Sequence, residues 1–155
     1  MRAFLLTVSD WISSVAKIGY LPVAPGTWAS FIALLVWWYF IPENETVIYI
    51  LVLVNLFLVG VITSVIVSEH KKENDPSSVV IDEWVGMWIA LIFVPKQLSW
   101  MLGSFFLFRL FDITKIFPAN RLEKVRGGWG IMLDDVAAGI YTIIILLLVR
   151  VIFML

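Results

Sequence analysis

Five carboxylates in this sequence lie at or just inside the ends of apolar segments, where an unpaired charge is costly: Asp82, Glu83, Asp112, Asp134 and Asp135. Burying such a charge at a membrane centre costs at least ~2.5–3.5 kcal/mol, and less near the membrane edge. Carboxylates held close together also repel each other, and a bound divalent cation relieves that repulsion. Because three apolar segments carry acids at the same depth, the pattern predicts one convergent site.

Each acidic position also has an ordinary explanation. Asp112 lies three residues from both Arg109 and Lys115, so these three side chains can form ion pairs on one helix face. The Asp134–Asp135 pair lies near the expected start of a helix, where negative charge complements the helix dipole. Either explanation is sufficient for one feature alone, but neither accounts for all the acidic sites together.

Two glycine-bearing turns offer backbone N–H groups to an anion. In the first, Pro25–Gly26 makes a turn and Thr27 is the expected N-cap of a helix that begins at Trp28. The second precedes the helix with the Asp pair and contains Gly127, Gly128 and Gly130, which permit close backbone approach. Cations occur beside both turns, at Arg109, Lys115 and Arg126. Cations and free N–H groups next to carboxylates favour a metal–phosphate site.

Other routes for phosphate hydrolysis lack the residues they need. The chain has no cysteine, which excludes a cysteinyl-phosphate intermediate. Its single histidine, His70, lies in a charged loop, so a mechanism with two histidines is excluded. The run from Asp134 to Val136 lacks the Asp-x-Asp spacing of aspartyl-phosphate enzymes. Water activated by a metal held on carboxylates is the simplest remaining chemistry.

The segments that carry these residues have the composition of membrane helices. Hydrophobic residues make up 61% of the chain and charged residues 15%, against about 25% charged in soluble domains. The run Thr46–Val67 has no charged residue, and Ile131–Leu155 is apolar except for the Asp pair and Arg150. A bilayer crossing needs about 20 residues, so both runs are long enough. Two buried helices of a soluble protein are the weaker alternative.

Three further apolar runs are shorter: Thr27–Ile41, Trp84–Val94 and Leu98–Phe111. The last two flank Pro95–Lys96 and predict a tight helical hairpin that crosses with tilt, with local thinning of the bilayer, or only in part. We therefore expect an all-α polytopic membrane bundle with about five transmembrane helices, forming one domain over residues 1–155. Residues 1–20 look amphipathic and interfacial, and they lack the features of a signal peptide.

Basic residues predict the orientation of this bundle. Lysine and arginine occur before the first span, after the second and after the fourth, whereas the connection 42–45 has none. By the positive-inside rule the N-terminus and the loops 68–80 and 113–130 face the cytoplasm, and the C-terminus lies outside. All carboxylates except Glu43 and Glu45 then fall on the cytoplasmic side. The net charge of −1 gives little information about partners.

Four blocks of this sequence resemble the phosphatidylglycerophosphatase A family, in the right order and from about residue 10 to 150. They read Gly19…Pro22-x-Ala24-Pro-Gly-Thr27-x-x-Ser30, Asp82-Glu83-x-x-Gly86, Phe108-Arg-x-Phe-Asp112-x-x-Lys115 and Gly127-Gly-x-Gly-x-Met-x-Asp134-Asp-x-x-Ala-Gly139. One departure is visible. The family often has Lys-Pro after the third block, whereas here Lys115 is followed by Ile116-Phe117-Pro118.

The resemblance implies a magnesium-dependent enzyme of the bacterial cytoplasmic (inner) membrane. It would remove the terminal phosphate of phosphatidylglycerophosphate, with its active site facing the cytoplasm. On this hypothesis the five acids hold one or two Mg²⁺ ions, and Asp82, Glu83, Asp134 and Asp135 form the catalytic set. Arg109, Lys115 and the turns at Gly26–Thr27 and Gly127–Gly130 would bind the phosphate, with one acid, for example Glu83, as general base.

Other substrates and functions remain open from the sequence. Another lipid phosphate or a polyprenyl phosphate is an alternative substrate, because no motif in the sequence indicates which head group the site would bind. A cation or proton carrier would also place carboxylates in a membrane, but usually near the midplane, and a structural subunit would leave the acids unexplained. We expect a phospholipid substrate and the bilayer as partners, and no nucleic acid. The oligomeric state is open.

Overall fold

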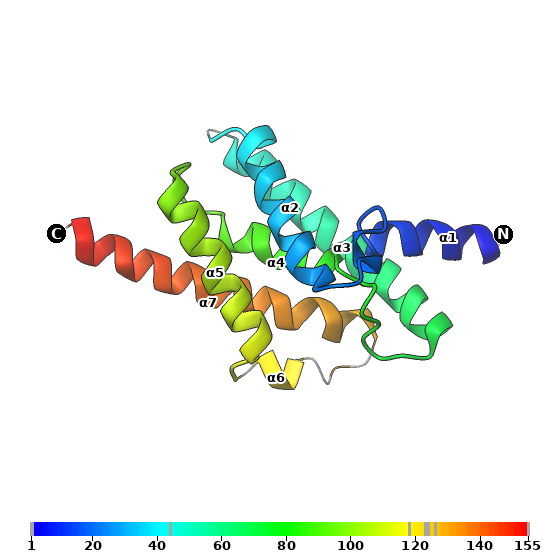
Figure 1. Ribbon diagram of the computed structural model, residues 1–155. Coiled ribbons are helices and arrows are strands. Elements are labelled where there is room, and N and C mark those ends of the chain that lie inside the picture. Colours follow the sequence, from blue (N-terminus) through cyan, green and yellow to red (C-terminus); the bar gives the residue numbers. More distant parts are fainter. Residues whose placement is uncertain (1, 44, 118, 123–124, 126, 155) are drawn as a thin grey trace.

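The computed structural model describes residues 2–43, 45–117, 119–122, 125 and 127–154, and these form helices without any strand (Figure 1). The all-α prediction is confirmed for this part of the chain. Arg126, expected beside the second glycine turn, and Pro118, where the sequence departs from the family pattern, lie outside the described residues. The elements are α1 (Arg2–Ser13), the 3₁₀ helix η1 (Ile18–Tyr20), α2 (Pro25–Phe40), α3 (Thr46–Lys71), α4 (Ile81–Ala90), α5 (Leu98–Thr114), α6 (Ala119–Leu122) and α7 (Gly128–Met154).

Two helices, α3 and α7, are long and apolar enough to cross a membrane. Both expose large apolar side chains along much of their length, among them Val47, Leu51, Ile62, Ile144, Leu148 and Ile152. A soluble protein rarely leaves such continuous apolar surfaces in water. The exposed faces therefore favour a lipid environment over the core of a soluble domain.

The other helices are shorter than a full crossing requires. α2 has 16 residues, α4 has 10 and α5 has 17, which correspond to about 24, 15 and 26 Å against a hydrocarbon core of about 30 Å. The expected helix Trp84–Val94 ends at Ala90, and an irregular turn follows up to Gln97. Pro95 disfavours helical backbone at Val94, the last residue of the expected helix, but this effect does not reach back to Ala90. The hairpin is therefore looser than predicted.

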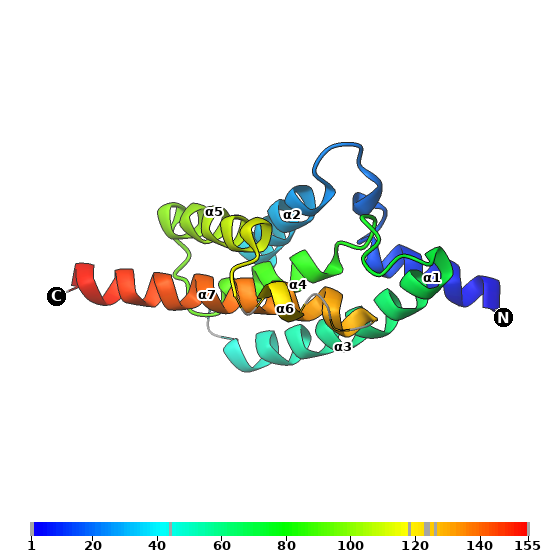
Figure 2. The same ribbon diagram turned by 90° about the horizontal axis from the view of Figure 1, so that it is seen from below.

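The short helix α4 forms the centre of the bundle (Figures 1 and 2), where it packs against α2, α3, α5 and α7. Most of its side chains are buried, including Val85, Met87 and Trp88. Trp88 Nε1 donates a hydrogen bond to Ala33 O in α2 at 2.9 Å, and the Tyr49 hydroxyl of α3 donates one to Trp88 O. These bonds tie α4 to both neighbours and fix the position of the acids in its first turn.

The N-terminal segment packs across the end of α3 that leads into the 72–80 loop. α1 contacts α3, buries Ser9 and Ser13 and exposes apolar side chains such as Phe4 and Trp11, as an interfacial helix would. Asp10 binds Lys17 and accepts a hydrogen bond from Tyr20. Partial burial raises the pKa of the Asp10 carboxyl, but these two partners outweigh it and leave the pKa below its usual value. The chain termini lie at opposite ends of the molecule (Figure 2).

Candidate active site

Two glycines bring α4 and α7 into backbone contact at the site. A Cβ atom on Gly86 would lie 2.7 Å from the carbonyl oxygen of Asp135, and one on Gly139 would lie 2.6 Å from the carbonyl oxygen of Gly86. Neither space admits a side chain. Each glycine follows an acid by four residues, at Asp82 and Asp135, so glycine and acid share one face of their helix. The close approach of the two helices therefore brings these two acids together.

Asp82, Glu83 and Asp135 form the centre of the site, which we call the acidic triad. One carboxylate oxygen from each lies within 4.8 Å of the others. Asp82 is 9% and Asp135 2% exposed. Asp82 Oδ1, Glu83 Oε2 and Asp135 Oδ2 are buried and have no hydrogen-bond partner among the described residues. Carboxylates so close together repel each other, and this donor set fits a hard divalent cation that prefers oxygen ligands.

The other two predicted metal ligands lie beside the triad, each with its own cation. Asp112 pairs with Arg109 at 2.5 Å, so the ordinary ion pair considered from the sequence is present here. Asp134 Oδ2 lies 2.8 Å from Lys115 Nζ, and its Oδ1 accepts the backbone N–H of Asp135 at 3.1 Å. The structure thus gathers three of the five acids into a triad and places the remaining two around it.

The two cations approach the triad from α5. Arg109 Nη1 also donates a hydrogen bond to Ser30 Oγ of α2 at 3.3 Å, and its charge acts on Glu83. Its Nε is buried without a partner in the described part of the chain. Lys115 caps the end of α5 with φ 43° and reaches α7 through its bond to Asp134. Both cations therefore lie among the predicted acids, paired with Asp112 and Asp134.

The first predicted phosphate turn lies directly against the triad, although its helix begins earlier than expected. A Cβ atom on Gly26 would overlap the carboxyl group of Glu83. α2 begins at Pro25 with Ala24 as N-cap, so Thr27 lies inside the first turn and the N-cap role predicted for it is wrong. Proline explains this start, because its fixed φ suits the first helical position. The unbonded N–H groups of a helix start therefore lie beside Glu83.

The second glycine turn takes part in helix packing. α7 already begins at Gly128. The Cα of Gly128 packs closely against the backbone of α3, because a Cβ atom there would overlap the carbonyl oxygen of Val61. Gly130 donates its N–H to Gly127 O at 3.1 Å, within the helix start. Gly127 has φ +76°, which glycine adopts readily. The geometry thus gives Gly128 a packing role and engages the Gly130 N–H within the helix start. The phosphate role of this turn stays a prediction.

One acid near the site received no role from the sequence. Asp75, exposed in the 72–80 loop, acts electrostatically on Asp82 and on Asp134. The loop is held firmly: Ser68 Oγ donates to Glu73 O at 2.6 Å, and the backbone N–H of Val80 donates to Ser13 O at 2.9 Å. The sequence offered one indication of this role. Asp75 lies in a short loop that leads into α4, whose first turn carries Asp82 and Glu83.

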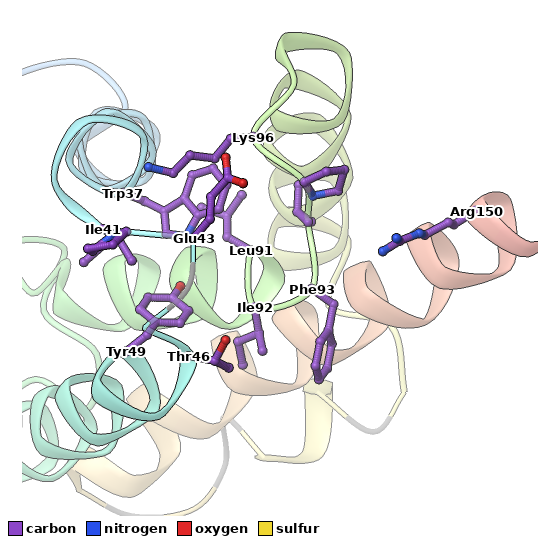
Figure 3. Close-up of a pocket in the computed structure, with 13 residues that line it drawn as sticks. Trp37, Ile41, Glu43, Thr46, Tyr49, Leu91, Ile92, Phe93, Lys96 and Arg150 are labelled. Carbon is purple, nitrogen blue, oxygen red and sulfur yellow. The ribbon is translucent and has the colours of Figure 1, made fainter.

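A polar pocket of about 270 Å³ lies elsewhere in the bundle, at the turn between α4 and α5 (Figure 3). Trp37, Glu43, Tyr49, Lys96 and Arg150 are among its lining residues. Lys96 Nζ donates to Trp38 O at 2.8 Å. None of the predicted site residues lines it, so this pocket is separate from the acidic triad.

The fold and the site define a class: a helical membrane protein whose buried acids and flanking cations suit a metal ion and a phosphate group. The comparisons are more specific. Residues 11–150 match the family model described as phosphatidylglycerophosphatase A. The chain belongs to the phosphatidylglycerophosphatase A family.

Three curated relatives are similar over most of their length. A Bacteroides thetaiotaomicron protein, named provisionally as a phosphatidylinositol-3-phosphatase, is 37% identical over 138 residues, which cover 85% of this chain and 87% of the relative. Phosphatidylglycerophosphatase A of Haemophilus influenzae is 34% identical, covering 85% of this chain and 82% of its own. The Escherichia coli protein of the same name is 34% identical, covering 79% and 72%. No solved structure is significantly similar.

Proposed function

We propose that this protein hydrolyses the terminal phosphate ester of phosphatidylglycerophosphate and leaves phosphatidylglycerol. Membership of the family and the names of two relatives support this substrate. The observation that carries the proposed chemistry is the acidic triad, in which carboxylate oxygens of three residues lie within 4.8 Å of one another, and each residue has one buried oxygen without a hydrogen-bond partner in the described part of the chain. Such an arrangement suits a phosphate ester and a divalent cation together.

Mg²⁺ is the cation we propose for the triad. Asp82, Glu83 and Asp135 would hold it directly, and Asp112 and Asp134 would add negative charge around it or hold a second ion. The bound ion would polarise the phosphoryl group and make water a stronger acid. The unpaired oxygens support this assignment because a magnesium ion supplies the positive charge that the triad lacks.

The chain's own residues would bind the phosphate and move the proton. Lys115 and Arg109 would neutralise the phosphoryl oxygens, with the N–H groups at the start of α2 as further donors. Glu83, which lies against Gly26 and near Arg109, is our candidate base for the attacking water, through the carboxylate oxygen that the metal ion would leave free. The water oxygen forms a bond to phosphorus as the ester P–O bond breaks, and the leaving oxygen takes a proton. The products are inorganic phosphate and the lipid alcohol.

We further propose a multi-pass arrangement in the inner membrane of a bacterium, with the triad facing the cytoplasm. α3 and α7 would cross fully, while α2, α4 and α5 would complete about five crossings through tilt and local thinning of the bilayer. The basic connections at the ends of α3 and α5 support this orientation. The substrate and the site would then lie on the same side of the membrane.

A second candidate substrate is phosphatidylinositol 3-phosphate. The relative from Bacteroides thetaiotaomicron, at 37% identity, carries that activity in its name. Both candidates are lipid phosphomonoesters, so the same triad and cations would serve either. The difference would lie in the head group that the site accepts.

The experiment that tests the proposal is a substrate panel with the detergent-purified protein and Mg²⁺. We expect phosphate release from phosphatidylglycerophosphate to exceed release from phosphatidylinositol 3-phosphate and from a polyprenyl phosphate, each presented at the same surface concentration. Faster release from phosphatidylinositol 3-phosphate would replace the first candidate by the second. No release from any of the three, by protein shown to be folded, would overturn the proposed reaction.

A further inference from the structure

An apolar groove of about 210 Å³ lies between α5 and α7, and the proposed reaction leaves it unused. It is lined by Phe111, Ile116, Phe117, Tyr141, Ile144 and Ile145. The rings of Phe111 and Tyr141 meet edge to face, with centroids 5.6 Å apart. Phe117 is 61% and Ile144 50% exposed, so the groove is open along one side. The α7 residues on this open side belong to one of the two helices that are long and apolar enough to cross a membrane.

The residues that line the groove lie close in sequence to residues of the acidic site. Phe111 of α5 precedes Asp112, and Ile116, just beyond the end of α5, follows Lys115. On α7 Tyr141 follows Asp134 by seven residues, so the two side chains share a helix face about 10 Å apart along the axis. One end of the groove therefore lies near the charged side chains and the rest extends away from them.

A charged site followed by an apolar groove matches the chemistry of a lipid phosphate. The charged end offers cations to the phosphate, and the apolar lining offers contacts to a hydrocarbon chain. The 10 Å offset leaves room for a polar head group between phosphate and chain. The Tyr141 hydroxyl beside the groove is buried and has no hydrogen-bond partner in the described part of the chain, which leaves a polar group unsatisfied between the acidic site and the groove.

We propose that this α5–α7 groove holds an acyl chain of the lipid substrate while its phosphate occupies the acidic site. The proposal rests on the proposed function, because it takes a lipid phosphate as the substrate. The groove would align the ester for attack and would favour substrates with long chains. It therefore identifies residues that determine specificity but take no part in the reaction itself.

A second apolar hollow provides a matched control. It lies on α3 and is lined by Ile48, Leu51, Val52, Asn55, Leu56 and Val59. It also faces outward, but none of the predicted site residues lines it. A bulky side chain in this hollow changes the lipid-facing surface in the same way without entering the path from the site.

The test compares Ile144→Trp with the control Leu51→Trp on two substrates with one head group, long-chain phosphatidylglycerophosphate and its dihexanoyl analogue. We expect Ile144→Trp to lower kcat/KM for the long-chain lipid by about tenfold or more, as lost burial of two or more methylene groups would. Its activity on the short-chain analogue, and both activities of Leu51→Trp, should stay near wild type. Equal loss on both substrates, or no loss on either, would overturn the groove assignment.

Labelling keeps the proposal testable if Ile144→Trp fails to fold or the substrate assignment is wrong. Wild-type protein in EDTA is mixed with a lipid phosphate whose acyl chain carries a diazirine, and with a phosphatidylcholine that carries the same chain. We expect the phosphate probe to label Phe117 or Ile144 more strongly than the phosphatidylcholine probe does. Equal labelling by both probes at the groove and at the α3 hollow would contradict the proposal. An inactive wild type with selective labelling would reject only the reaction.

Discussion

At the scale of single residues, pairing decides which acids are available to a metal ion. Asp112 and Asp134 have a cation at 2.5 and 2.8 Å, respectively. Asp82, Glu83 and Asp135 of the triad each have one buried oxygen without a hydrogen-bond partner among the residues that the structure describes. A buried carboxylate oxygen without a hydrogen bond lowers stability, and clusters of such groups are candidates for functional sites. The triad is therefore the part of the acidic set that we expect to hold the ion most directly.

Asp75 should tune the affinity for the metal ion without taking part in the reaction. It is exposed, but its charge acts on Asp82 and Asp134 across the loop. We expect Asp75→Asn to raise the Mg²⁺ concentration for half-maximal activity about tenfold, with kcat at saturating Mg²⁺ changed by less than about twofold. A titration of activity against Mg²⁺ checks this. Glu69→Gln, an exposed acid on α3, is the control, and identical curves for both variants would refute the role of Asp75.

At the scale of elements, the glycine contact between α4 and α7 sets the position of the triad. A methyl group on Gly86 would meet the Asp135 carbonyl at 2.7 Å, so Gly86→Ala must separate the helices. We expect the free energy of unfolding to fall by about 1–3 kcal/mol and phosphate release to fall with it. Gly103→Ala in α5 is the matched control, because its nearest atom is Leu146 Cδ2 at 4.0 Å.

The Gly103 variant should keep its activity and gain up to about 1 kcal/mol, since alanine favours a helix more than glycine. Thermal unfolding in detergent and phosphate release measure both effects. If the two variants behaved alike, close packing at Gly86 would not be what positions the acids.

The sequence carried enough information for the helices and for the acids, but not for every contact between distant segments. Apolar runs and acid positions are local features, so α3, α7 and the convergence of Asp82 with Asp135 were predictable. The packing of Gly128 on the α3 backbone was not, because it depends on a tertiary approach between helices far apart in the chain. The start of α2 at Pro25 follows from a local rule, the preference of proline for the first helical position, and this preference outweighs that of Thr27 for the N-cap.

At the scale of the whole molecule, the proposed orientation puts the triad and the turn at residues 42–45 on opposite sides of the membrane. The chain has no cysteine, so single cysteines report their side without a background. In intact cells we expect a membrane-impermeant thiol reagent to label Glu43→Cys, and to label Glu73→Cys only after permeabilisation. The opposite labelling pattern would reverse the orientation, and labelling of both in intact cells would contradict a crossing by α3.

The most direct test of the central claim is phosphate release from phosphatidylglycerophosphate by the purified protein, with Mg²⁺ and with excess EDTA. We predict release that requires the metal and that falls on the order of 10²-fold or more in Asp135→Asn, the effect of removing one preorganised group from an active site. Asp135→Asn should remain folded, because it removes a repelling charge from the triad. Release that persists in EDTA, or in a folded Asp135→Asn protein at the wild-type rate, would contradict the account.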